Sequence, residues 1–279
     1  MNKFYIQSVL FLLSISLYVN NKTIATEPDS GKDTTRISKK RYATSEEIYE
    51  QNNHLLCTDP EEIKNAEELM NDAVMHLVYH ATNNDGYELY KKCNPSKMAI
   101  YKKKHDDHTD VEKTEYTVSG SHMYNEIINK LWDPTHPCFF NIISVERRIV
   151  RVYNPNLVMI QQLYKKKCKS RWKYFYALAT KAEISEGTFA FVMTSANIND
   201  GYPSDKEYKN TLIEKANLFK ADINSEDDIR KGKLKKAFVN ISGYLIEKKG
   251  DNLEIIYVES MDERDSIYHM FKNALSQKL

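Results

Sequence analysis

The chain has little of what marks the common catalytic and cofactor-binding sites. Glycine is scarce, with 8 residues in 279, and we find no G-x-S-x-G elbow, P-loop, G-x-G-x-x-G fingerprint or H-E-x-x-H motif. Each of these motifs supplies a nucleophile, a phosphate cradle or a pair of metal ligands. Their absence argues against the major hydrolase, nucleotide-binding and zinc-protease classes. We expect a protein that is not an enzyme and needs no cofactor.

Patterns of metal ligands are equally sparse. The four cysteines include no C-x-x-C pair, which argues against a zinc ribbon and a thioredoxin-type site. Residues 105–108 read HDDH, but they form a polar turn whose spacing implies no further ligand. We expect no metal site. Disulfide bonds and buried thiols are both open for the cysteines, with three possible pairings of Cys57, Cys93, Cys138 and Cys168.

Charge excess and long apolar runs are also limited. The 40 basic and 39 acidic residues nearly balance, whereas a nucleic-acid-binding protein shows a clear basic excess, so we expect no nucleic-acid partner. The one long apolar run, residues 8–19, has 12 residues, fewer than the roughly 20 that cross a bilayer. Lys3 precedes the run and Ala25 follows it. This predicts a cleaved secretory signal peptide over residues 1–25, and hence secretion or export, rather than a membrane anchor.

The rest of the chain divides into a linker and one domain. Residues 26–54 are largely polar and charged, which predicts a linker. Residues 55–279 are long enough for a single domain with a large core. A first helix is signalled by the N-cap sequence Asp59-Pro60-Glu61-Glu62 and by an apolar stripe at three- and four-residue steps. The stripe comprises Ile63, Ala66, Met70, Ala73, Leu77 and Ala81.

Strand signals dominate the chain beyond this helix. Three β-rich runs precede a helix over Ser121–Trp132, and six more runs lead to a final helix over Glu263–Leu279. Short turns between consecutive strands favour an antiparallel meander and an α+β fold. A short helix is expected near 207–215, inside the polar span 197–235. The predicted strands are Tyr87–Lys91, Met98–Lys102, Val111–Val118, Val145–Tyr153, Leu157–Tyr164, Trp172–Glu183, Thr188–Ala196, Phe238–Ile246 and Leu253–Val258.

The last two strands predict a hairpin, because Gly250 supplies the positive φ that the turn at 248–252 tolerates. A curved sheet clamped by the following helix can enclose an apolar ligand. Its lid candidates are Ile267, Met270, Phe271 and Ala274, which share one face of that helix. An ordinary α+β core without a cavity is the alternative.

Alternation within the strands suggests which side chains face such a cavity. Trp172, Tyr174 and Tyr176 share one face of their strand, and their hydroxyl and indole groups need polar partners when buried. A polar headgroup would supply these partners, although a packed core explains the same pattern. We take these three residues as the first cavity candidates. The other candidates are Gln162, Trp132, Phe139, Phe140, Phe189, Phe191 and Met193.

Several blocks resemble a known family. LWDPTHPCFFN (131–141), RVYNPNLVMIQQLYKKK (151–167) and VMTSANIND (192–200) are similar to the fam-a multigene family of malaria parasites, as is SEDDIRKGKLKKAFVNISGYLIEKK (225–249). The resemblance covers nearly the whole chain. Members of that family resemble START lipid-transfer domains, whose helix-grip fold wraps a curved antiparallel sheet around a C-terminal helix over an apolar cavity. The START signatures here are SGYLI (242–246) and YVESMD (257–262).

The resemblance implies a secreted, monomeric carrier that moves a phospholipid, phosphatidylcholine in particular, between membranes. It also implies the parasitophorous vacuole or the host cell as the destination. The lysine runs 102–104 and 165–167 suggest transient contact with an anionic membrane surface, or else plain solvated loops. The competing hypothesis is an exported or surface interaction protein that uses the same fold without lipid transfer.

Overall fold

The computed structural model of the chain describes residues 42–93, 98–106, 109–135, 144–165, 171–204 and 206–262. The predicted signal peptide and the predicted C-terminal helix lie outside these residues. None of the helices within the described ranges is long and apolar enough to cross a membrane.

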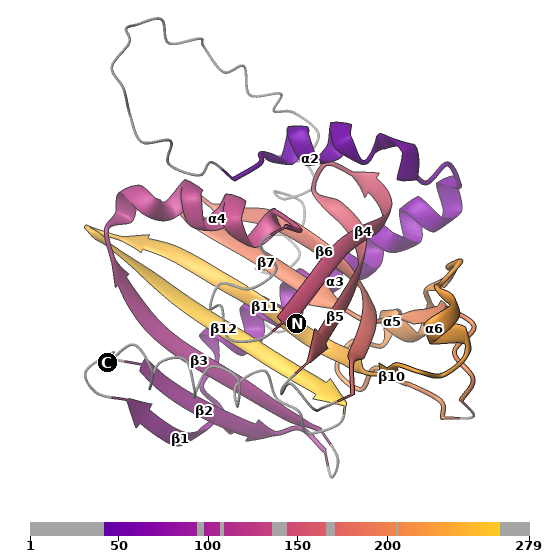
Figure 1. Cartoon of the computed structure of the whole chain (residues 1–279). Helices are drawn as coiled ribbons and strands as arrows, with labels where there is room; N and C mark the ends of the chain where they lie inside the picture. Colours follow the sequence, from indigo (N-terminus) through magenta and orange to yellow (C-terminus); the bar gives the residue numbers. More distant parts are fainter. Residues whose placement is uncertain are drawn as a thin grey trace, which may run out of the picture. The chain divides into compact units, whose positions relative to one another are not determined.

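A large, mainly antiparallel sheet forms the centre of the fold (Figure 1). Its ten strands among the described residues run in the order β1-β2-β3-β12-β11-β7-β6-β5-β4, and β10 pairs in parallel with β6. A separate parallel pair joins β8 to β9. The strands are β1 (Glu88–Cys93), β2 (Met98–Lys104), β3 (Asp110–Ser119), β4 (Ser144–Asn154), β5 (Leu157–Lys165), β6 (Lys173–Ser185), β7 (Thr188–Thr194), β8 (Asn197–Asn199), β9 (Lys220–Asp222), β10 (Lys235–Lys236), β11 (Phe238–Lys249) and β12 (Asn252–Asp262).

This topology confirms the predicted α+β class and the meander. Strands β4 to β7 follow one another through antiparallel pairings, and the predicted hairpin appears as β11–β12, with Gly250 at φ 59° in its turn. The meander alone does not give the whole order. Strand β12 also pairs with β3, which joins the last strand to the first three.

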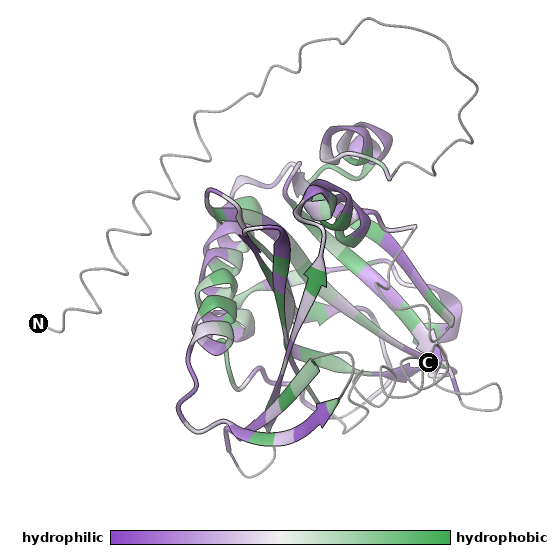
Figure 2. Cartoon of the chain, turned by 90° about the vertical axis from the view of Figure 1, so that its left-hand side faces the viewer, coloured by the Kyte–Doolittle hydropathy of each residue, from purple (hydrophilic) through white to green (hydrophobic). Residues whose placement is uncertain are grey.

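Helices cover both faces of the sheet, as Figures 1 and 2 show together. Helix α3 (Pro60–Thr82) begins where predicted, because the Asp59 carboxylate accepts from the backbone N–H of Glu61 at 2.9 Å and of Glu62 at 3.4 Å. The predicted stripe of α3 packs on one face of the sheet, and α4 (Tyr124–Trp132) packs on the other. The remaining helical pieces are α2 (Ser45–Gln51), α5 (Lys215–Leu218), α6 (Asp227–Arg230) and the 3₁₀ turns Asn53–Leu55 and Ser121–Met123.

The folded region begins earlier than the predicted boundary at residue 55. Helix α2 lies within the predicted linker 26–54 and starts with a capping box, in which Thr44 and Glu47 bond to each other's backbone N–H. Its Ile48 is 2% exposed and joins the core on the α4 side of the sheet. One buried apolar side chain and a sound cap therefore order a segment whose composition is largely polar.

The polar span 197–235 also differs from its prediction. No helix forms over 207–215 except at its last residue, where α5 begins. The reason is Asn210, which is 1% exposed and whose Oδ1 accepts from the backbone N–H of Leu212 and Ile213. A side chain that takes over these donors favours a turn instead of a helix.

Cysteine chemistry is settled for two of the four residues. Neither Cys57 nor Cys93 forms a disulfide bond, and burial raises the pKa of the Cys57 thiol. Cys138 and Cys168 lie outside the described residues.

Close packing of α3 on the sheet depends on Gly243 in β11. A methyl group at this position would lie 2.4 Å from the Phe191 carbonyl oxygen and 3.1 Å from a Leu77 methyl of α3. Because the first neighbour is backbone, it cannot swing away. Only glycine fits between these two groups.

We therefore predict that Gly243→Ala lowers the free energy of unfolding by about 1–3 kcal/mol, the usual cost of overpacking. Chemical denaturation measures this change. Gly250→Asn is the control, since Gly250 is exposed, a Cβ added to it would meet no atom within 4 Å, and asparagine tolerates positive φ. A loss below about 0.5 kcal/mol for Gly243→Ala would contradict this account.

Candidate functional site

The face of the sheet that α4 covers, here called the α4 face, is a continuous apolar layer. Alternate residues of six neighbouring strands point to it, and α4 adds its own apolar side chains. The layer contains Tyr124, Ile127, Leu131, Trp132, Ile149, Val158, Ile160, Tyr164, Phe175, Ala177, Ala179, Phe189, Phe191, Met193, Tyr244, Ile246, Ile255 and Tyr257.

Four of the predicted cavity residues meet on this face. Phe189, Phe191 and Met193 alternate along β7, and Trp132 reaches them from the end of α4. The Trp132 and Phe191 rings lie edge to face with centroids 6.2 Å apart. Tyr244 of β11 extends the aromatic layer, with its centroid 6.5 Å from that of Phe191. The structure thus brings these four candidates together.

The first cavity candidates lie on the opposite face, so the prediction that they line the same cavity is wrong. Tyr174 and Tyr176 belong to the core beneath α3, and Trp172 borders a recess beside Gln161 and Glu226. The alternation of β6 was predicted correctly, but the residues that reach the α4 face are Phe175, Ala177 and Ala179.

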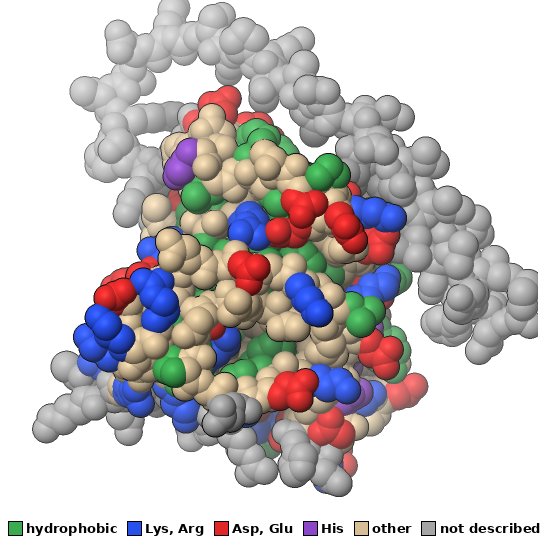
Figure 3. All heavy atoms as spheres, turned by 90° about the vertical axis from the view of Figure 1, so that its right-hand side faces the viewer, with side chains coloured by type: hydrophobic (Ala, Val, Ile, Leu, Met, Phe, Trp, Pro, Cys, Tyr) green, Lys and Arg blue, Asp and Glu red, His purple; other side chains and the backbone are tan. Residues whose placement is uncertain are grey.

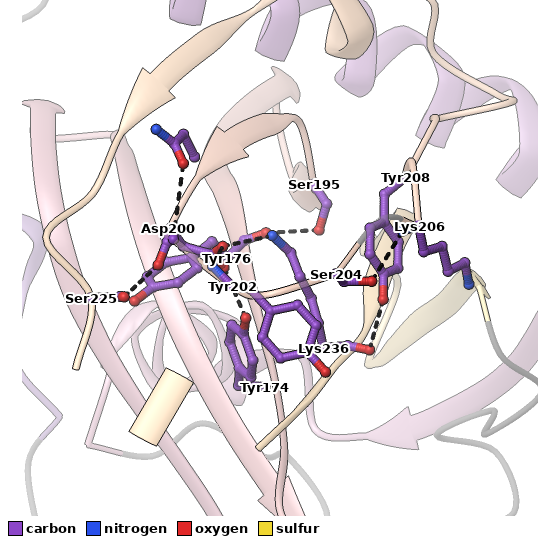
Figure 4. A network of polar contacts seen from close by, with 12 residues as sticks. Tyr174, Tyr176, Ser195, Asp200, Tyr202, Ser204, Lys206, Tyr208, Ser225 and Lys236 are labelled. Carbon is purple, nitrogen blue, oxygen red and sulfur yellow. Dashed lines mark hydrogen bonds and ion pairs between the residues drawn. The ribbon is translucent and has the colours of Figure 1, made fainter. Parts of the chain in front are cut away.

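Protein groups already satisfy these tyrosines, and Figure 4 shows the contact of Tyr174 with Asp200. The Tyr174 hydroxyl donates to the Asp200 carboxylate at 2.9 Å, and Lys236 donates to the same carboxylate at 2.9 Å. The Tyr176 hydroxyl accepts from Gln161 at 2.8 Å, and burial raises its pKa to about 12. These hydroxyls therefore need no headgroup, and the network holds the segment after β8 against β6.

Gln162, another predicted cavity residue, faces the α4 side. Its Oε1 accepts from Nε of Arg147 at 3.0 Å and from an Nη of Arg147 at 2.9 Å. The other Nη donates to the Leu131 carbonyl at the end of α4, at 3.3 Å. Arg147 is half-buried, with its guanidinium 5.9 Å from the Phe191 ring centroid. Gln162 thus orients a cation against the aromatic layer.

A buried donor lies beside this cation. The indole Nε1–H of Trp132 has no hydrogen-bond acceptor within the described part of the chain, although the residue is only 6% exposed. Trp132 and Arg147 line the same small cavity, of about 10 Å³, whose other described lining is apolar. A space of this size holds about one oxygen atom. Leaving the indole N–H unsatisfied is costly, so an acceptor atom from a ligand or a water fits here.

A second cation lies over the Trp132 indole ring. Lys181 is half-buried, and its Nζ is 5.4 Å from the Trp132 ring centroid. Burial lowers the pKa of Lys181 to about 8. An indole N–H, a guanidinium and an ammonium group, all of which donate, thus lie close together at Trp132.

Two groups of predicted site residues fall outside the described ranges. They are the aromatic pair Phe139 and Phe140 and the lid candidates Ile267, Met270, Phe271 and Ala274. Conversely, Arg147 was not among the predicted site residues. Arg147 lies opposite Gln162 in the β4–β5 pairing, so a correct prediction of the strand register would have identified it.

Comparison with known proteins supports the fold. No protein-family model matches the chain, and no curated protein matches it either. Among solved structures, the chain is similar to human StAR-related lipid transfer protein 5, with a TM-score of 0.51 and 11% identity over 77% of this chain and 92% of that one. Human STARD10 also matches, with a TM-score of 0.44 and 11% identity over 74% and 73%. The similarity to StAR-related lipid transfer protein 5 shows that the fold is START-like.

Lys181 yields a pH-dependent prediction. Its pKa is about 8 in the folded chain against 10.5 when unfolded, so the unfolded state binds more protons between these values. The contribution of Lys181 to stability should therefore rise as the pH increases from 8 to 10.5. Lys181→Met should remove this rise and add about 1 kcal/mol of stability at pH 7, after allowance for solvent screening. Thermal or denaturant unfolding at several pH values measures both effects.

The control for this substitution is Lys248→Met, because Lys248 is exposed. It should leave the pH dependence between 8 and 10.5 unchanged. Equal pH profiles for wild type and Lys181→Met would show that the ammonium group is not desolvated.

Proposed function

We propose that the protein is a non-enzymatic carrier that binds one phospholipid on its α4 face and transfers it between membranes. The observation that carries this proposal is the buried, unsatisfied indole N–H of Trp132 beside Arg147, at the polar end of an apolar layer. The fold supports it, because a START-like sheet presents the layer. No group of three potential metal ligands occurs within the described residues, and we propose no catalytic step.

The energetics require enclosure of the acyl chains. A diacyl lipid has roughly thirty methylenes at about 0.8 kcal/mol each, so water exposure costs about 24 kcal/mol. The cavity of about 10 Å³ at Trp132 holds no more than one atom of such a ligand. In our proposal, loading therefore separates α4 from the sheet and lets the acyl chains replace its contacts with the α4 face.

The donors favour a phosphate over a sterol hydroxyl. Trp132, Arg147 and Lys181 together can donate to several oxygens, and a phosphodiester offers acceptors in that number and carries the opposite charge. We propose phosphatidylcholine as the cargo because of the family resemblance. Membership of the fam-a family and action as a monomer in the vacuole or host cell are proposed on the same ground, whereas secretion is proposed because of the apolar run at residues 8–19.

The direct test is the lipid content of the protein. The chain, purified without detergent, should carry close to one phospholipid per molecule by mass spectrometry of the organic extract, and it should transfer labelled phosphatidylcholine between neutral vesicles. A lipid-free protein that transfers nothing would contradict the carrier and favour the interaction protein.

A matched pair of variants locates the site. Arg147→Leu should lower phospholipid content and transfer about tenfold, the effect of losing one charge-assisted hydrogen bond of about 1.5 kcal/mol. Arg230→Leu removes an exposed arginine of α6 and should change neither. Melting temperatures of both variants show whether the fold survives. Equal transfer by Arg147→Leu and wild type would remove Arg147 from the site.

A further inference from the structure

Basic side chains gather at one end of the sheet, where β5 ends and β6 begins. Register places Lys165 next to this junction, and the Lys165 ammonium lies 5.7 Å from the Trp172 ring centroid. Arg171 donates to the backbone carbonyls of Gly232 and Lys233. These contacts hold the segment after α6 beside the start of β6.

Strand β10 continues the same cluster. Lys235 pairs with Lys173 in parallel, and its backbone N–H donates to the Trp172 carbonyl at 3.0 Å. Lys231 and Lys233 each have 61% of their side chains exposed. We call this group the basic end; it comprises Lys165, Arg171, Lys173, Lys231, Lys233 and Lys235.

Its charge is concentrated relative to the rest of the chain. With Arg148, the six basic residues have four acidic neighbours, Glu146, Glu226, Asp227 and Asp228, which leaves a local charge of +3, while the whole chain has a net charge of +1. Asp227 and Asp228 pair with Lys231 and Lys233 at 2.7 and 2.8 Å. Lysine and arginine side chains gather at one corner of the face shown in Figure 3, whereas acidic ones are spread over it.

Trp172 gives this basic end an amphipathic centre. The indole is half-buried and borders an open recess of about 480 Å³, whose described lining includes Leu163, Leu234 and the Arg148–Glu226 ion pair. A tryptophan among exposed cations is the combination that locates a protein surface at the headgroup level of a bilayer.

We propose that the basic end docks on the surface of an anionic bilayer, with Trp172 at the interface. The position fits the proposed carrier function, on which this role in delivery rests. Lys165 lies three residues beyond Gln162 on β5, a distance of about 10 Å along the strand. Docking therefore brings the end of the α4 face that holds Gln162 and Arg147 close to the membrane.

Vesicle binding tests the proposal. The full chain should co-sediment with vesicles of phosphatidylcholine containing phosphatidylserine, more strongly than with pure phosphatidylcholine, and salt should weaken this binding. The triple variant Arg171→Gln, Lys231→Gln and Lys233→Gln should lower the partition coefficient about a hundredfold, since each charge near the surface contributes about fivefold.

The matched control removes three exposed lysines from other elements, Lys64→Gln, Lys92→Gln and Lys248→Gln, and should change partition less than about threefold. In a Trp132→Phe background, Trp172 is the only tryptophan, and its emission should shift to the blue on anionic vesicles. Equal partition of the basic-end variant and wild type would overturn the proposal. If the chain binds heparin as strongly as it binds anionic vesicles, and the Trp172 emission does not shift on vesicles, the partner is a soluble polyanion and not a membrane.

The two proposals fail separately. If docking is wrong and the carrier is right, the triple variant transfers lipid between neutral vesicles at the wild-type rate and no variant alters binding to anionic ones. If the carrier is wrong and docking is right, anionic vesicles still bind the chain, but no phospholipid is transferred.

Discussion

A sheet buried on both faces constrains everything else in this structure. Six neighbouring strands, β4 to β7 with β11 and β12, alternate their side chains between a core under α3 and a layer under α4, so neighbouring residues serve different purposes. The two glutamines of β5 show this directly. Gln161 donates to Tyr176 and Glu226 on the α3 side, while Gln162 accepts from Arg147 on the α4 side. Polar contacts thus hold the α3 side together, whereas on the α4 side the Trp132 indole N–H has no acceptor in the described part of the chain.

That difference separates scaffold from site. On the α3 side, Gly243 lets a helix approach the strand backbone, and Asp200 ties Tyr174 and Lys236 together in the interior. On the α4 side, aromatic rings meet mostly through apolar contacts, and the Trp132 indole N–H lacks an acceptor in the described part of the chain. A face held by non-directional contacts can exchange them for acyl chains at little cost, because both are apolar.

Most of the secondary structure could be predicted from the sequence, but the face of the sheet that each side chain joins could not. Caps and apolar stripes predicted α3, and alternation predicted the strands, because both signals are local. Alternation groups Tyr174 with Tyr176, yet it does not say which side of a doubly buried sheet they join. The partners that decide this, such as Asp200, come from a distant polar segment.

The register of β4 against β5 could not be predicted from the sequence, for a related reason. Counting back from the turn at 155–156 pairs Gln162 with Ile149, but two irregularities in β4 shift its partner to Arg147. A bulge inserts an extra residue that no composition rule announces. The main polar contact of the candidate site depends on this shift.

The most direct test of the account uses Trp132 as a reporter, because it and Trp172 are the only tryptophans and lie on opposite sides of the sheet. In a Trp172→Phe protein, phospholipid with brominated acyl chains should quench Trp132 fluorescence and saturate at one lipid per protein. Unquenched Trp132 in a protein that has bound the brominated lipid would contradict the assignment of the α4 face as the lipid site.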